Sequence, residues 1–104
     1  MTSFDFQSHH LVITVESPIF EASGADSLGT GFERYLSEAI ESVHIDLRRV
    51  ESIDSSGVDA LVSLKERLRR QRGECPMALR NPGPKVMSVI NLLGLDRIFQ
   101  VETV

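Results

Sequence analysis

The alternation of apolar and polar residues is clearest in the middle of the chain, where a predicted strand runs into a predicted helix. A period of two over residues 43–47 predicts a half-buried strand with three apolar side chains on one face: Val43, Ile45 and Leu47. From Val58 onward, apolar residues recur at helical spacing and form one broad arc: Ala60, Leu61, Val62, Leu64 and Leu68. The opposite arc is polar, and on it Glu66 and Arg70 are spaced to form an ion pair.

The other apolar segments continue this alternation of strands and helices. Phe4 and Phe6, followed by the β-branched run 11–15, predict two short strands joined as a hairpin. A second amphipathic helix, ending near Ser42, is predicted from residues at three- and four-residue steps: Leu28, Phe32, Tyr35, Leu36, Ala39 and Ile40. After the central helix, the pattern predicts a strand at 77–79, a helix at 86–93 that ends at Gly94, and a last strand at 98–101.

This order of elements predicts the fold class. Helices between strands require parallel neighbours with right-handed crossovers, whereas the first two strands form an antiparallel hairpin. Because the strands alternate instead of reading as continuous apolar runs, the helices are expected to cover mainly one face. The prediction is an α/β fold with a mixed β-sheet, in a single domain over residues 1–104.

Composition narrows the functional classes. The 104 residues are 41% apolar and 25% charged, which is typical of one soluble globular domain. The net charge of −4 argues against electrostatically driven binding to nucleic acid or to an anionic membrane. The single cysteine, Cys75, excludes an internal disulfide and suits a reducing compartment. Without a signal-peptide pattern or a long apolar run, we expect a cytoplasmic protein with no direct membrane insertion.

No metal or cofactor site is predicted. His9 and His10 are adjacent, so on a strand they face opposite ways and make a poor shared metal site. The chain has no zinc-ligand spacing and no glycine-rich phosphate cradle.

The segment Asp54-Ser55-Ser56-Gly57, between the central strand and helix, is the candidate functional site. Serine and aspartate are favoured N-caps, so the helix is predicted to begin at or beside the serines. Unpaired N–H groups and partial positive charge at a first helical turn stabilise an attached phosphate, which makes Ser55 a candidate phosphoacceptor. Phosphorylation adds about −1.5 to −2 charges. Placed next to Asp54 and within a helical turn of Asp59, this charge is expected to eject an acidic or apolar partner while the fold survives.

Two other interpretations of this segment stay open. In the first, the hydroxyl of Ser55 or Ser56 is only an N-cap, because this composition is common in turns. In the second, the chain is an enzyme, which requires a base near Ser55. His44 begins the preceding strand, His9 and His10 lie in a distant turn, and the Gly-x-Ser-x-Gly pattern of a nucleophile elbow is absent. We therefore predict no catalytic residues.

The chain resembles the STAS domain (sulfate transporter and anti-sigma factor antagonist) from about Leu11 to Val101. The resemblance is carried by VHIDLRRVESIDSSGVDALVSL, the Arg72-Gly73-Glu74 turn and LRNPGPKVMSVINLLGLDRIFQV. In stand-alone antagonists of that family, the serine directly after the aspartate is phosphorylated by a switch kinase that also acts as the anti-sigma factor, and Ser55 matches that serine.

The resemblance implies a non-enzymatic partner-switching regulator of transcription. The unphosphorylated form is expected to bind the anti-sigma factor kinase, the phosphorylated form to be released, and a separate phosphatase to reset it. The docking surface is expected to include Asp54, Ser56, Gly57 and Asp59 around the phosphoserine.

The chain departs from the family pattern after the second strand. The family commonly carries a Gly-Glu-Leu-Asp-like signature there, and residues 16–21 read Glu-Ser-Pro-Ile-Phe-Glu instead. In relatives this region contributes to kinase docking, so the departure bears on partner identity. The alternative function is a constitutive STAS subunit of a lipid or anion transporter or of a signalling scaffold, with Ser55 only a cap.

Overall fold

The computed structural model describes residues 2–103 and has the predicted α/β fold with a mixed sheet. The elements follow in this order: β1 (Thr2–Gln7), β2 (His10–Val15), β3 (Ile19–Phe20), α1 (Ala22–Glu33), β4 (Ser42–Asp46), β5 (Ser52–Ile53), α2 (Ser55–Arg72), β6 (Met77–Arg80), α3 (Pro84–Leu93), the 3-10 helix η1 (Leu95–Arg97) and β7 (Gln100–Glu102).

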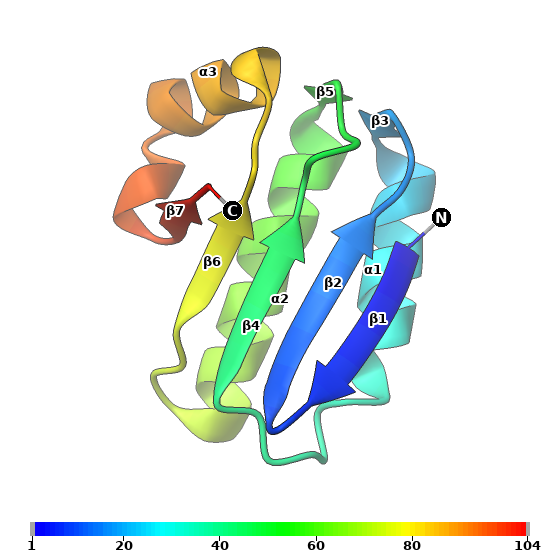
Figure 1. Ribbon diagram of the computed structural model, residues 1–104, viewed down its shortest axis with the longest axis vertical. Helices are drawn as coiled ribbons and strands as arrows, with labels where there is room; N and C mark the ends of the chain where they lie inside the picture. Colours follow the sequence, from blue (N-terminus) through cyan, green and yellow to red (C-terminus); the bar gives the residue numbers. More distant parts are fainter. Residues whose placement is uncertain (1, 104) are drawn as a thin grey trace.

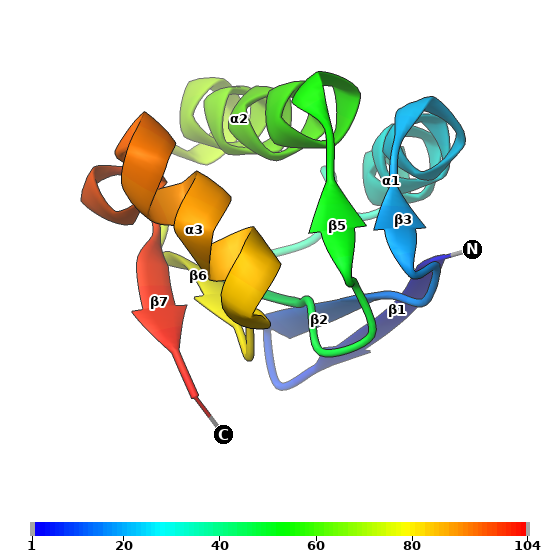
Figure 2. The same ribbon diagram turned by 90° about the horizontal axis from the view of Figure 1, so that it is seen from above.

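The main sheet has the strand order β1-β2-β4-β6-β7 (Figure 1). The β1–β2 hairpin is antiparallel and the other neighbours are parallel, as predicted. Figure 2 shows α1 and α2 over the same face of this sheet, while α3 lies beyond the carboxyl end of β6. Within residues 2–103, the opposite face of the sheet carries no helix (Figure 2).

The core lies between the sheet and α1 and α2. Its strand contribution follows the predicted alternation and is fully or almost fully buried: Leu11, Ile13, Val15, Val43, Ile45, Met77 and Leu79. The helices close the core with equally buried residues: Leu28, Phe32, Leu61, Leu64 and Leu68. Full burial of one such side chain contributes about 1.5–3 kcal/mol, so this face fixes which side of each strand points inward.

The first helix lies earlier in the chain than the apolar spacing predicted. It spans Ala22–Glu33 and does not extend to Ser42. The hairpin turn holds the following segment, because His9 O accepts the Glu41 N–H at 2.7 Å and His9 Nδ1 lies 2.9 Å from Ala39 O. Tyr35 and Leu36 contact the core from turns and Ile40 from an irregular segment, which gives them a helix-like apolar spacing without a helix.

Other differences are local. The last strand is shifted to Gln100–Glu102, because residues 95–97 form η1 and Ile98 is exposed. The central helix does carry the predicted apolar arc, but Val62 lies at its edge and is 38% exposed. On the polar side of this helix, Glu66 contacts Arg69 at 4.0 Å and not Arg70, so the predicted pair is wrong by one position.

Candidate functional site

Backbone pairing between two distant segments positions the start of α2. The two-residue strands β3 and β5 form a separate parallel pair, with Phe20 opposite Ile53. Pro18 O accepts the N–H groups of Glu51 and Ser52 at 2.7 and 3.1 Å, and Phe20 O accepts the Asp54 N–H at 3.2 Å. The segment that departs from the family signature, residues 16–21, is therefore bonded directly to the approach to Ser55.

Asp54, and not a serine, caps the helix. Its side chain accepts the Gly57 N–H at 3.0 Å, its backbone is extended, and α2 begins at Ser55. The interpretation that Ser55 or Ser56 serves as the N-cap is therefore wrong. Ser55 is exposed at the first helical position, beside N–H groups that have no intrahelical partner. Its hydroxyl is accessible and is not the group that holds the helix start together.

Gly57 is needed for close packing beneath this turn. It is buried, and a Cβ built on it would lie 2.5 Å from Phe20 O and 2.8 Å from Ile53 Cγ1. Any side chain at this position would push α2 away from β3 and β5. The contribution of Gly57 is thus to the shape of the helix start, whereas Asp54 and Asp59 are exposed on its surface.

A cleft of about 340 Å³ opens beside Ser55 between the start of α2 and α3. It has an apolar wall and a rim that bears the two carboxylates, and its lining residues are Ile53, Asp54, Ser55, Val58, Asp59, Val89 and Leu93. Leu93, which lines the cleft, is 54% exposed, and the preceding Leu92 at the end of α3 is 84% exposed. Leucines this exposed beside a cleft are typical of a surface that binds another protein.

Sequence reasoning did not connect α3 with Ser55. The available signal was Leu92, which lies two residues after Ile90 and therefore off the buried stripe formed by Val86 and Ile90.

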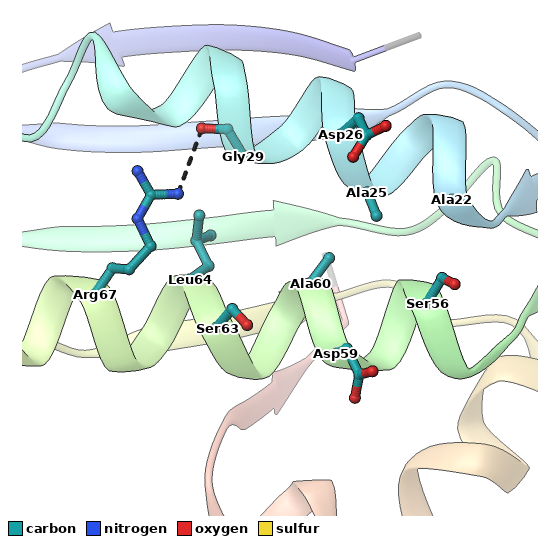
Figure 3. A pocket seen from close by; sticks show the side chains of 10 residues that line it. All are labelled: Ala22, Ala25, Asp26, Gly29, Ser56, Asp59, Ala60, Ser63, Leu64 and Arg67. Carbon is teal, nitrogen blue, oxygen red and sulfur yellow. Dashed lines mark hydrogen bonds between the residues drawn. The ribbon is translucent and has the colours of Figure 1, made fainter.

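A second groove, of about 360 Å³, separates α1 from α2 (Figure 3). Small residues keep the helices close without filling it: Ala22, Ala25, Gly29, Ser56, Ala60 and Ser63. Ser56 is half-buried here and points toward α1, so the two adjacent serines face different surroundings (Figure 3). Arg67 closes the far end, where Nη1 donates to Gly29 O at 3.5 Å.

Among residues 2–103, no helix has both the length and the apolar character that crossing a bilayer requires.

Comparisons with known proteins agree with this fold. An anti-sigma-factor antagonist (STAS) domain protein from Planctomyces limnophilus superposes with a TM-score of 0.83 at 19% identity, covering 98% of this chain and 88% of that one. The Bacillus cell fate determinant SpoIIAA, solved in the phosphorylated form, gives a TM-score of 0.73 at 17% identity, with 97% and 90% covered. A sulfate transporter family protein from Wolinella succinogenes gives 0.78 at 21% identity, with 94% and 80% covered.

No curated protein sequence matches the chain. At these identities the structural matches establish the fold, and the sequence itself supplies the family assignment. The STAS domain family model matches residues 2–104, which is almost the whole chain. The chain therefore belongs to the STAS domain family.

Proposed function

We propose that this protein is a non-enzymatic partner-switching regulator of the anti-sigma factor antagonist kind. Unphosphorylated, it binds an anti-sigma factor that is also a serine kinase; phosphorylation at Ser55 releases it, and a phosphatase restores the first state. The observation that carries the proposal is the exposed Ser55 hydroxyl at the start of α2, on the rim of the cleft formed with α3.

The helix start is suited to accept a phosphate without unfolding. Because Asp54 makes the capping hydrogen bond, modification of Ser55 leaves that bond in place. The positive end of the helix dipole stabilises an anion there by about 0.3–1 kcal/mol. This offsets part of the repulsion between the phosphate and the neighbouring carboxylates, so the fold is expected to persist in both states.

The same phosphate opposes docking. A partner that covers the apolar wall gains about 25 cal/mol for each Å² of apolar surface removed from water. Leu93 and Val58 supply such surface next to Ser55. A dianion on this rim must be desolvated or left facing the partner, and it adds to the charges of Asp54 and Asp59.

Phosphorylation and binding are tested separately. Incubation with ATP and the ATP-binding kinase encoded nearest to the gene should add one phosphate, detected by intact mass. Ser55→Ala should abolish the addition, and Ser56→Ala is the matched control that should retain it. A phosphate that persists in Ser55→Ala removes the proposed site.

Binding is compared between Ser55→Asp and Ser55→Asn, which have the same shape and differ in charge. Calorimetry with the same kinase should show at least about tenfold weaker binding for the aspartate variant, equivalent to about 1.4 kcal/mol, and near wild-type binding for asparagine. Leu93→Ser should weaken binding without affecting folding.

A constitutive subunit of a transporter or signalling scaffold is the second candidate function, favoured by the similarity to a sulfate transporter family protein. In that case the aspartate and asparagine variants should bind the assembly equally well, with no switch in partner choice.

A further inference from the structure

A continuous line of hydrogen bonds crosses the helix-free face of the sheet, far from Ser55. Ser42 Oγ on β4 lies 2.6 Å from His10 Nδ1 on β2 and 3.2 Å from His44 Nε2. His44 Nδ1 lies 2.8 Å from Glu102 Oε1 on β7, and Arg80 Nε on β6 donates to the same oxygen at 2.9 Å. Strands β2, β4, β6 and β7, which carry these side chains, lie side by side in this order (Figure 1).

The donors and acceptors along this line can be assigned. Burial alone would raise the pKa of the Glu102 carboxyl, but hydrogen bonds from Arg80 and His44 outweigh it and lower that pKa, so the group is an ionised acceptor at neutral pH. The proton of neutral His44 therefore lies on Nδ1, and its Nε2 lone pair faces Ser42. The Ser42 hydroxyl then donates to His44 and accepts from His10 Nδ1.

Ser42, His44 and Glu102 thus stand in the order nucleophile, base and carboxylate that activates serine in acyl-transfer sites. We propose that Ser42 is a second reactive serine, an acceptor for short acyl groups from activated esters or thioesters. This site is independent of the partner-switching function and of Ser55.

The surroundings limit the chemistry to activated donors. Strand β4 is paired with β2 from Ser42 onward and with β6 from Val43 onward, so backbone N–H groups beside Ser42 are used in the sheet and are not arranged to stabilise an oxyanion. Loss of even one such donor costs about 10²–10³ in rate, so amides and ordinary esters should not react. Ser42 is 9% exposed, which admits only a small acyl group.

In the proposed step, the Ser42 oxygen attacks the acyl carbon while its proton moves to His44 Nε2. The new Oγ–C bond forms, the bond from the acyl carbon to the leaving oxygen or sulfur breaks, and the leaving group departs with the electron pair. The proton on His44 then passes to the leaving group or to water. Glu102 acts as a positioning residue, because it holds the N–H of His44 and stabilises the protonated ring.

The test uses the full chain and p-nitrophenyl acetate. One acetyl group per chain should appear at Ser42 by peptide mass mapping, together with a single burst of nitrophenolate. Ser42→Ala should remove this adduct, and His44→Gln should slow its formation about 100-fold, the lower end of general-base contributions. Ser37→Ala, at an exposed serine outside both sites, is the matched control and should label at the wild-type rate.

The role of Glu102 is tested by the pH profile of labelling at Ser42. The titratable or charged groups around Ser42 and His44 are Glu102, which contacts His44, and Arg80, which contacts Glu102. His10 shares Ser42 with His44 and lies 3.9 Å from Glu41, and Asp46 follows His44 by two positions on β4, opposite Arg80. Glu102→Gln keeps an acceptor oxygen but loses the negative charge, so the midpoint of the profile should move to lower pH. A profile that does not move overturns the positioning role.

Circular dichroism should show each variant folded. Acetylation confined to lysines or the N-terminus overturns the proposal, as does equal labelling of Ser42 in wild type and His44→Gln.

Discussion

The molecule places two serines in opposite chemical situations. Ser55 is exposed at the start of α2, and within residues 2–103 no histidine hydrogen-bonds to it. Ser42 is almost buried on the helix-free face of the sheet and lies within hydrogen-bonding distance of two histidines. Accessibility and activation are therefore separated. In the proposed phosphorylation, Ser55 takes its base and its phosphoryl donor from another protein, whereas in the proposed acylation Ser42 has its base, His44, within the fold.

The largest expected effect concerns the turn that presents Ser55. Gly57→Ala should lower the free energy of unfolding by about 1–3 kcal/mol, because the new Cβ would clash with Phe20 O and Ile53. Urea denaturation measures the change. Gly29→Ala in α1 is the matched control, since its Cβ would meet only Arg67 Nη1 at 3.8 Å, and it should be neutral or stabilising. Equal stability of the two variants would contradict the close packing described for Gly57.

The next largest effect on stability distinguishes the capping residue, Asp54, from the proposed phosphoacceptor, Ser55. Asp54→Ala should cost about 1 kcal/mol through loss of the bond to Gly57 N, whereas Asp54→Asn keeps an acceptor oxygen and should cost little. Thermal unfolding of both variants, with Ser55→Ala alongside, checks this. If Ser55→Ala is destabilised as much as Asp54→Ala, the serine contributes to the cap after all.

The smallest expected effect is the contribution of Glu102, on the helix-free face of the sheet, to the free energy of unfolding, and it depends on pH. The pKa of Glu102 is lowered in the folded protein because hydrogen bonds and charge from Arg80 and His44 outweigh its burial. Its ionised form therefore stabilises the fold above the pKa of the unfolded chain, and that contribution is lost as the pH falls through the folded pKa. Glu102→Gln should be less stable than wild type by under about 1 kcal/mol at pH 7. Urea denaturation should show that the difference in free energy of unfolding between wild type and Glu102→Gln disappears below about pH 4. A difference that stays constant with pH would exclude a charge effect.

Local patterns sufficed to predict the strand at β4, the start of α2 and the mixed sheet. Alternation and capping residues act over a few positions, so they can be read directly from sequence. The end of α1 could not be predicted, because it depends on the hairpin at His9, which holds residues 39–41 from a distant part of the chain.

The two candidate sites also differ in whether they depend on neighbouring residues or on contacts between distant parts of the chain. Ser55 was predicted as a phosphoacceptor from its neighbours along the chain, and that role stays a prediction; the identity of the cap was decided by backbone geometry that serine and aspartate both allow. His44 was set aside as a base because it is far from Ser55. Its contacts with Ser42 and with Glu102, 58 residues later, depend on strand register, which residue spacing does not reveal.

The short β3–β5 pair has a consequence for how such proteins diverge. Residues 16–21 are bonded through their backbone to residues 51–54, so a substitution or length change in the first segment alters the surface next to Ser55 without touching the acceptor itself. Under the proposed function, related chains that differ only in residues 16–21 therefore bind different partners while they retain Ser55 and its capping aspartate, so parallel signalling routes stay separate.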